Sequence, residues 1–351
     1  MDVVQARATR ATLATVAASA GVSVATVSKV LNGRSDVAPD TRARVQALLT
    51  EHEYVPTAPR RVGTPDRPSI EVALDGDLHL YSAEILQGVV EAGAEAGVSV
   101  VVSIRSGGRQ GITADRPAAW AGDLAAAGRT AVIAVTSELT STHVSALARA
   151  RLPLVVIDPL NLARSRVVSV GSTNFAGGLA ATRHLLMLGH RRIAYVGGPA
   201  TAACNQARVH GYRAAMEAEG APVLPGYVWT GRFEYQYGVT GGAAVFDLPE
   251  PPTAVFAGSD EMALGVIEAA RACGLRIPDD LSVVGFDDTQ LARMASPPLT
   301  TVRQPLTEMG VVAVRTALRL AAHEKIESHH VELATELVVR GSTAPPARGG
   351  A

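Results

Sequence analysis

The chain has 351 residues, of which 47% are hydrophobic and 19% are charged. This composition excludes an intrinsically disordered protein and allows a sizeable core, while the length favours more than one domain. The net charge of −1 hides an asymmetry, since residues 1–61 carry eight basic and five acidic side chains and the remainder carries 24 and 28. A basic head on an acidic body suits a small nucleic-acid-binding module.

Cysteine and histidine usage argues against disulfides and metals. Cys204 and Cys273 are the only cysteines, so no disulfide framework is implied. The histidines lack the spacing of a metal site, and we expect neither a metal nor a cofactor. No segment resembles a signal peptide or approaches the roughly 20 apolar residues of a membrane span. We therefore expect a cytoplasmic protein without membrane contact.

The first structured segment is predicted at residues 11–56, after a disordered stretch at 1–10. Gly21 separates two helical patterns, because glycine accepts backbone angles that other residues resist, and Ser23 is a favoured N-cap for the second helix. The inward-facing residues with helical spacing are Leu13, Val16, Ala17 and Ala20 before the glycine, and Val27, Val30 and Leu31 after it. This pattern predicts a helix-turn-helix whose second helix enters a major groove, with an ordinary αα-hairpin as the alternative.

A third helix is expected after Pro39, and the head closes at residue 56. Residues 57–68, T-A-P-R-R-V-G-T-P-D-R-P, form a linker rich in Pro, Gly and Arg.

Residues 69–341 alternate short apolar runs with helical stretches, and a flexible tail follows at 342–351. The predicted strands are 70–74, 98–103, 131–135, 154–157, 193–196, 253–256 and 281–286. Helices are predicted between them, for example at 83–96, 176–188, 206–219 and 261–273, each followed by a glycine in the C-cap region. This βαβ alternation predicts an α/β fold with parallel sheets. About ten such units exceed one compact sheet, which favours two doubly wound subdomains with a ligand cleft at the strand carboxyl ends.

Aspartates that follow these strands are candidates for binding sugar hydroxyls, because a carboxylate accepts two hydrogen bonds from neighbouring hydroxyls. Asp158 and Asp287 directly follow strands. Such an aspartate often serves instead as a helix N-cap. We keep the N-cap interpretation for Asp260 and Asp288 and leave it open for Asp287.

Several motifs together resemble those of the LacI/GalR (lactose-repressor) family of bacterial transcription regulators. They are A-G-V-S-x-x-T-V-S-K-V-L-N within 20–32, T-R-A-R-V-Q-A-L-L-T-E-H-E-Y-V-P at 41–56, T-R-H-L-L-M-L-G-H-R-R-I-A-Y-V-G-G-P at 182–199, F-A-G-S-D-E-M-A-L-G at 256–265, L-S-V-V-G-F-D-D at 281–288 and P-P-L-T-T-V-R-Q-P at 297–305. The motifs occur in the family's order and cover nearly the whole chain. The resemblance implies a periplasmic-binding-protein-like effector and dimerisation domain with crossovers near 170, 302 and 330. One subdomain would comprise about 69–170 and 303–329, and the other about 171–302 and 330–341.

DNA contacts are expected on the second helix. A cation at Lys29 can donate to guanine O6 and N7, and the resemblance places Val24 and Ala25 where family members contact bases. Phosphate contacts, which position the protein without specifying sequence, are expected from Thr12, Ser28, Asn32 and Arg34. Plain solvation is the alternative for each residue.

The linker departs from the family pattern, in which it folds on DNA into a hinge helix with a leucine wedged into the minor groove. Gly63 stands about where that leucine is expected, so Val62 is the candidate wedge. Arg60 and Arg61 are expected to enter a narrow minor groove or to meet phosphates. A plain tether is the alternative.

For the cleft, the resemblance places Asp158, Arg208, Ser259 and Asp287 among the effector contacts and Phe233 as an aromatic that packs on the ligand. It places Tyr81, Ser82, Cys204 and Gln304 in the cleft wall. Purine-responsive relatives carry an extra basic residue just before Cys204, where this chain reads A-T-A-A at 200–203. The lack of that cation favours a sugar.

We therefore expect a homodimeric transcriptional repressor that binds a pseudo-palindromic, double-stranded DNA operator and is released by a sugar effector. A purine-type, corepressor-dependent regulator is the alternative within the class. A solute-binding receptor for sugar transport is the alternative of another class, although it would need an export signal. Paired catalytic groups and nucleotide-binding loops are not found, so we do not expect an enzyme.

Overall fold

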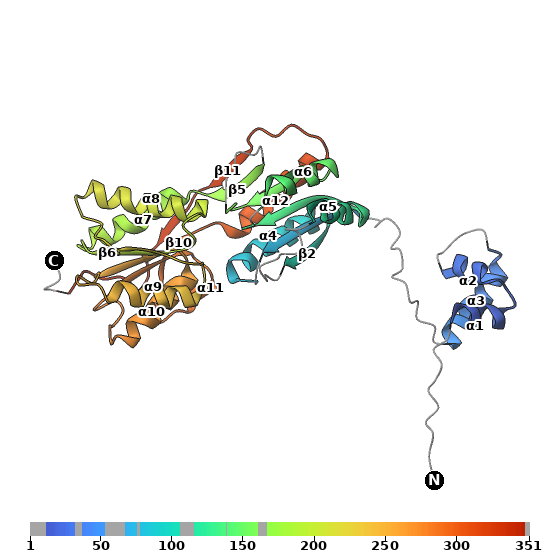
Figure 1. The fold of residues 1–351 in the computed structure, drawn as a ribbon, viewed down its shortest axis with the longest axis horizontal. Coiled ribbons are helices and arrows are strands. Elements are labelled where there is room, and N and C mark those ends of the chain that lie inside the picture. The colour runs from blue at the N-terminus through green and yellow to red at the C-terminus, as the bar shows by residue number, and fades with distance from the viewer. Residues whose placement is uncertain are drawn as a thin grey trace, which may run out of the picture. The chain divides into compact units, whose positions relative to one another are not determined.

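The computed structural model describes residues 12–31, 37–52, 67–75, 78–105, 116–137, 139–160 and 167–347. It divides into two compact units, Met1–Asp66 and Arg67–Ala351. Figure 1 shows the small helical unit and the larger α/β unit. The expected disordered stretch 1–10 and most of the linker 57–68 lie outside the described residues.

In its described part the first unit contains the helices α1 (Leu13–Ala20), α2 (Val24–Leu31) and α3 (Pro39–Glu51). Its buried core comprises Val16, Ala17, Ala20, Val27, Val30 and Val45. Gly21 ends α1 with a φ of 64°, in the left-handed region that glycine adopts without strain. The hydroxyl of Ser23 accepts a hydrogen bond from the amide of Thr26 at 3.1 Å and so caps α2. The helix-turn-helix prediction is confirmed.

Thr12 begins α1 through a reciprocal cap. Its hydroxyl accepts from the amide of Thr15 at 3.3 Å, and the Thr15 hydroxyl accepts from the amide of Thr12 at 3.5 Å. Each side chain thus satisfies a backbone donor that the first helical turn leaves unpaired.

The larger unit holds two sheets in its described part. The first has the order β11-β5-β4-β3-β1-β2. Its strands are β1 (Ser69–Asp75), β2 (Ser99–Arg105), β3 (Arg129–Val135), β4 (Leu154–Ile157), β5 (Val168–Ser172) and β11 (His330–Leu333). One face packs on α4 (Leu80–Glu95) and α12 (Leu306–Ala321), and the other on α5 (Pro117–Ala126) and α6 (Ser141–Arg149). Both faces are apolar because the strands are parallel and covered on two sides.

The second sheet repeats this plan with the order β12-β10-β9-β8-β6-β7. Its strands are β6 (Ile193–Gly197), β7 (Val228–Thr230), β8 (Ala254–Ala257), β9 (Ser282–Asp287), β10 (Thr300–Arg303) and β12 (Glu336–Val338). Helices α7 (Asn174–Met187) and α8 (Ala203–Ala218) cover one face, and α9 (Tyr235–Phe246) and α10 (Asp260–Ala272) cover the other (Figure 1). The short α11 (Gln290–Met294) follows β9. Only β12 runs antiparallel to its neighbour among the described strands.

The chain crosses between the sheets at three places, near Thr173, Gln304 and Thr335. Thr335 donates its amide to the Thr173 hydroxyl at 3.0 Å, so two of these crossings are tied together. The prediction of a third crossing near 330 is wrong by several residues. β11 pairs with β5 in the first sheet, and the crossing follows only after Leu333.

Four predicted helices end as expected. Gly97, Gly189, Gly220 and Gly274 all have positive φ values just after α4, α7, α8 and α10.

No single helix in the described ranges is long and apolar enough to cross a membrane, although α1 and α2 together, with a bend of 100° between them, reach that length and composition. In this structure five apolar residues of that pair, Val16, Ala17, Ala20, Val27 and Val30, lie in the core of the first unit.

Candidate functional site

The first unit presents α2 as its candidate DNA-reading element. Val24, Ala25 and Lys29 are exposed, and Ser28 is half-buried. Thr12 is also exposed, at the start of α1. Five residues of the predicted DNA surface lie outside the described residues. They are Asn32, Arg34, Arg60, Arg61 and Val62. Residue-level contacts with DNA therefore stay predictions.

In the larger unit, a cavity of about 190 Å³, here called the cleft cavity, lies where the strands of both sheets end. The first sheet's half contributes Tyr81 and Ser82 at the start of α4 and Asp158 after β4. The second half contributes Cys204, Arg208, Phe233, Ser259 and Asp287. The structure thus brings together eight of the nine cleft residues predicted from the sequence. The ninth, Gln304, does not line the cavity but donates a hydrogen bond to Asp287, which does.

Asp158 is a buried acid that points into the cleft. The hydroxyl of Tyr81 donates to its Oδ2 atom. Burial raises the pKa of Asp158, and the Tyr81 hydrogen bond and the nearby Arg208 partly counteract that rise. Burial and Asp158 in turn raise the pKa of Tyr81 well above its usual value, so this hydroxyl stays a donor.

Arg208 is the central cation of the cleft cavity, and its side chain is only 4% exposed. Its Nε donates to the Asn174 side chain at 2.7 Å and its Nη1 to the backbone oxygen of Gly258 at 2.6 Å. The guanidinium stacks on the ring of Phe286, with 3.8 Å between its carbon and the ring centroid. These contacts fix the plane of the guanidinium, which faces Asp287 at 3.9 Å.

Asp287 is held from the crossover side. Gln304 donates its side-chain amide to Oδ1 of Asp287 at 2.7 Å and accepts a hydrogen bond from the Ser172 hydroxyl at the end of β5. Burial raises the pKa of Asp287 to about 7, against the lowering effects of Arg208 and Gln304. The relay from Ser172 through Gln304 to Asp287 links the two sheets where the chain crosses between them.

Ser259 and Phe233 also line the cleft cavity, as predicted. The Ser259 hydroxyl accepts from the amide of Met262 at 3.2 Å, so this residue caps α10 while it lines the cavity. The Phe233 ring lies over Gly198, where an added Cβ would approach the ring to 2.3 Å. The Arg208 guanidinium carbon lies 5.5 Å from the Phe233 centroid. An aromatic face beside polar groups is a common arrangement for a sugar ring.

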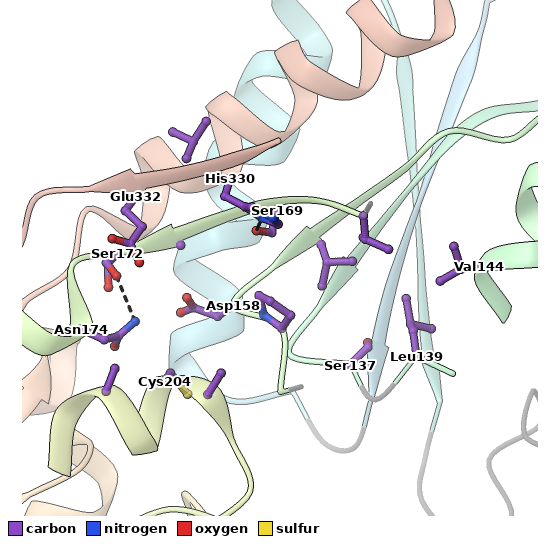
Figure 2. Close-up of a pocket in the computed structure, with 17 residues that line it drawn as sticks. Ser137, Leu139, Val144, Asp158, Ser169, Ser172, Asn174, Cys204, His330 and Glu332 are labelled. Carbon is purple, nitrogen blue, oxygen red and sulfur yellow. Dashed lines mark hydrogen bonds between the residues drawn. The ribbon is translucent and has the colours of Figure 1, made fainter. Parts of the chain in front are cut away.

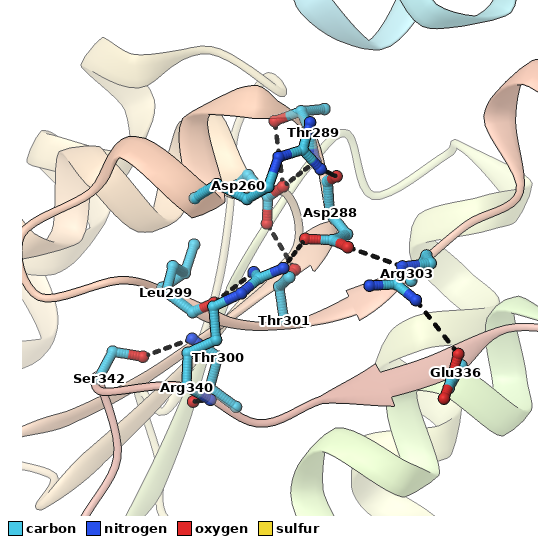
Figure 3. Close-up of polar contacts among 11 residues, drawn as sticks. Asp260, Asp288, Thr289, Leu299, Thr300, Thr301, Arg303, Glu336, Arg340 and Ser342 are labelled. Carbon is cyan, nitrogen blue, oxygen red and sulfur yellow. Dashed lines mark hydrogen bonds and ion pairs between the residues drawn. The ribbon is translucent and has the colours of Figure 1, made fainter.

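The N-cap interpretation of Asp260 and Asp288 is wrong. Ser259 and Thr289 hold the cap positions of α10 and α11. Asp260 is buried and accepts hydrogen bonds from Thr289 and Thr301 (Figure 3). Asp288 forms ion pairs with Arg303 at 2.7 Å and with Arg340 (Figure 3). Asp260 therefore joins the start of α10 to Thr289 and to Thr301 of β10. Asp288 joins the end of β9 to Arg303 of β10 and to Arg340.

Two contacts connect the subdomains on either side of the cleft. Nδ1 of His79, which precedes α4, lies 3.2 Å from the Glu261 carboxylate on α10. Glu84 on α4 accepts a hydrogen bond from the backbone of Gln290. These residues are not among those predicted from the sequence, because nothing local indicates that α4 faces α10 and α11. Asn174 is not among them either, although its place at the first position of a helix after a strand was a usable signal.

A second cavity, of about 580 Å³ and here called the side cavity, is also lined by Asp158, which Figure 2 shows among the other side chains of its wall. It shares Asp158 and Cys204 with the cleft cavity. Strands β5 and β11 contribute Ser169, His330 and Glu332. No pattern in the sequence predicts this cavity.

Among the described residues no group of three or more His, Cys, Asp or Glu side chains is placed to hold a metal ion.

A helix-turn-helix unit followed by a two-sheet body with a polar cleft at the strand ends defines a ligand-responsive DNA-binding protein. Comparison with known families agrees. Residues 12–57 match the family of bacterial regulatory proteins of the lacI type, and residues 182–343 match a periplasmic binding protein-like domain.

Relatives match along nearly their whole length. The HTH-type transcriptional regulator CelR of Thermobifida fusca is 35% identical over 343 residues, which cover 96% of this chain and 99% of the relative. The ribose operon repressor of Escherichia coli (strain K12) is 32% identical, covering 95% and 99%. The chain therefore belongs to the LacI family, and it is a DNA-binding transcriptional regulator.

Solved structures agree with the fold. A complex of the regulator CelR with cellobiose superposes with a TM-score of 0.71 at 34% identity, covering 95% of this chain and 100% of the other. The lac repressor dimer bound to operator and the anti-inducer ONPF gives 0.69 at 28% identity, covering 96% and 100%.

Proposed function

We propose that this protein is a homodimeric repressor that binds a pseudo-palindromic operator through α2 and is released when a sugar enters the cleft cavity. The observation that carries the proposal is the enclosure of Arg208 between Asp287 and Phe233 in that cavity. A guanidinium, a carboxylate and an aromatic face together match the hydroxyls and the apolar face of a pyranose. The solved relatives with cellobiose and with an operator support the same combination.

The crossovers between the two sheets support the proposed coupling between the ligand and the operator. The three crossovers lie together, and the relay from Ser172 through Gln304 ends on Asp287 in the cleft wall. A ligand that contacts both halves of the cleft favours the closed arrangement, and a change in DNA affinity requires that preference for one state.

The test is Arg208→Ala. We expect operator binding to remain and the response to the sugar to disappear, because the substitution removes charged hydrogen bonds worth roughly 1.5–3 kcal/mol, or about a tenfold to hundredfold loss of ligand affinity. Operator binding is measured with and without the sugar that calorimetry identifies for the wild-type protein, on a duplex selected from random sequence.

Arg213→Ala is the matched control, because Arg213 is an exposed arginine on the same helix. It should respond to the sugar like the wild type. If Arg208→Ala responds normally, the residue does not bind the effector. If the ligand strengthens operator binding of the wild type, the protein is a corepressor-dependent regulator and the proposed sign of the coupling is wrong.

A further inference from the structure

The side cavity is larger than the cleft cavity, and this difference indicates the size of the effector. The cleft cavity of 190 Å³ is smaller than the range of about 300–1,000 Å³ that ligand pockets usually occupy, whereas the side cavity of 580 Å³ lies within it. A ligand confined to the cleft cavity would leave the larger, adjoining space unused.

Asp158 is the partition between the two cavities. Its Oδ2 accepts the hydroxyl of Tyr81, which lines the cleft cavity. Its Oδ1 faces Gly171 of the side cavity, where an added Cβ would lie 3.0 Å from that oxygen. Glycine at this position keeps the floor of the side cavity open beside the carboxylate. One carboxylate thus presents an oxygen to each cavity.

The side cavity combines an apolar surface with hydrogen-bonding groups. Val156 of β4 and Val144 of α6 supply apolar surface. Ser169 and His330 lie on neighbouring strands, with 2.9 Å between the hydroxyl oxygen and Nδ1, and Figure 2 shows them beside each other on the sheet. Glu332, further along β11, adds a carboxylate. This alternation suits a sugar ring, whose edges carry hydroxyls and whose faces are partly apolar.

The charges of the lining discriminate between classes of ligand. Asp158 and Glu332 are acidic, and His330 is the only basic side chain among the described residues that line the side cavity. Two carboxylates disfavour a phosphate group by like-charge repulsion. The described lining also contains no Phe, Tyr or Trp on which a nucleobase would stack.

We infer that the effector is a neutral oligosaccharide of at least two sugar units, with one ring in the cleft cavity and the next in the side cavity, so that both contact Asp158. This inference rests on the proposed function, since it assigns the substrate class of the same site.

The test compares each monosaccharide with its disaccharides by calorimetry on the full chain. The probes are glucose with maltose and cellobiose, galactose with lactose, xylose with xylobiose, and the phosphate ester of each parent sugar. We expect at least one disaccharide to bind about tenfold or more tighter than its parent monosaccharide, and the phosphate esters to bind more weakly than either. Equal affinity for monosaccharides and disaccharides, or tight binding of a phosphate ester, would overturn the inference.

Ala207→Leu tests the location. Ala207 is half-buried on α8 and lines the side cavity but not the cleft cavity, so a larger side chain fills only the space assigned to the second ring. Disaccharide affinity should fall about tenfold, while monosaccharide affinity stays within about twofold. Ala218→Leu adds the same bulk at an exposed position of the same helix and should change neither affinity.

Glu332→Ala is the second variant, because it removes an exposed side chain of an edge strand and does not depend on how α8 tolerates added volume. It too should weaken only disaccharide binding. If both variants weaken monosaccharides and disaccharides equally, the second ring does not lie in the side cavity. If a monosaccharide alone binds fully and releases the operator, this inference fails while the proposed function stands. If none of the sugars binds, the sugar effector fails and this inference fails with it.

Discussion

Asp287 combines an unusual backbone conformation with an unusual charge environment. Its φ of 115° lies in a region that non-glycine residues avoid, and Asp158, across the cleft, also has a positive φ of 43°. Such strain persists only where the surrounding structure holds it, and it is concentrated at functional sites. Here both strained residues follow strands and direct carboxylates into one cavity, which supports a ligand-binding role for the pair.

The raised pKa of Asp287 predicts how stability depends on pH. The pKa of Asp287 is about 7 in the folded chain, and its ordinary value is 3.8. Between these two pH values the carboxyl of Asp287 is therefore protonated in the folded chain and ionised in the unfolded chain. The contribution of this one carboxyl to the free energy of unfolding is therefore greatest below about pH 4 and falls as the pH rises to about 7, with a slope of at most about 1.4 kcal/mol for each pH unit. Asp287→Asn should show a smaller fall in melting temperature between pH 5 and pH 8 than the wild type.

Asp280→Asn is the control for this experiment. The hydrogen bonds from Arg276 lower the pKa of the exposed Asp280 to about 2, so its stabilisation is lost only in stronger acid. Its pH dependence between 5 and 8 should match that of the wild type. An unchanged slope in Asp287→Asn would show that Asp287 is ionised throughout this range.

At the same scale, Lys29→Ala should relax base specificity at one position of each half-site. A cation that donates to guanine is worth about 1–3 kcal/mol of discrimination per contact, and Lys29 is exposed on α2. Competition binding with single-base-substituted duplexes measures the effect. Arg44→Ala removes an exposed charge from α3 instead and should leave the ranking of the duplexes unchanged. Uniform weakening of all duplexes by Lys29→Ala would identify Lys29 as a phosphate contact.

At the scale of elements, the helix pairs are packed through glycines. An added Cβ would lie 1.9 Å from a backbone oxygen at Gly88 where α4 meets α12, and 2.2 Å from one at Gly238 where α9 meets α10. Gly178 on α7 approaches the backbone oxygen of Arg208 on α8 in the same way, at 2.4 Å. The position of Arg208 in the cleft therefore depends on the close approach of α7 and α8.

Gly178→Ala should separate α7 from α8. Because the added methyl meets backbone that cannot rotate away, we expect a loss of about 1–3 kcal/mol in the free energy of unfolding and weaker effector binding. Gly122→Ala on α5 is the matched control, since its Cβ would meet nothing within 4 Å. That variant should gain about 0.5–1 kcal/mol through helix propensity. Equal effects of the two substitutions in chemical unfolding would contradict the packing argument.

At the scale of the whole molecule, residues 1–61 carry more basic than acidic side chains and the remainder carries more acidic ones. Operator affinity should fall steeply with salt, because phosphate contacts release counterions. If two heads make about 6–10 phosphate contacts, affinity should drop by about 10³–10⁵ between 50 and 200 mM salt. Electrophoretic titrations at several salt concentrations, with a scrambled palindrome as control, measure this. Affinity that ignores both salt and scrambling would contradict operator recognition.

The sequence by itself determined the features that depend on neighbours along the chain. Helical spacing around Gly21, the Ser23 cap and the glycines after four helices are local signals, and the structure has each of them. The acids after strands were also visible, because parallel strands place their carboxyl ends at one edge. The family motifs then assigned most of the cleft wall.

The tertiary structure decided what depends on residues far apart in sequence. A local pattern cannot distinguish an N-cap from the ion pairs that the buried Asp288 forms with Arg303 and Arg340, since both arrangements place an aspartate after a strand. β11 was assigned to the wrong half because its short His330–Leu333 run pairs with a strand about 160 residues earlier in the chain. The side cavity arises only where β5, β11 and α8 meet, and such a space forms only when those elements pack together.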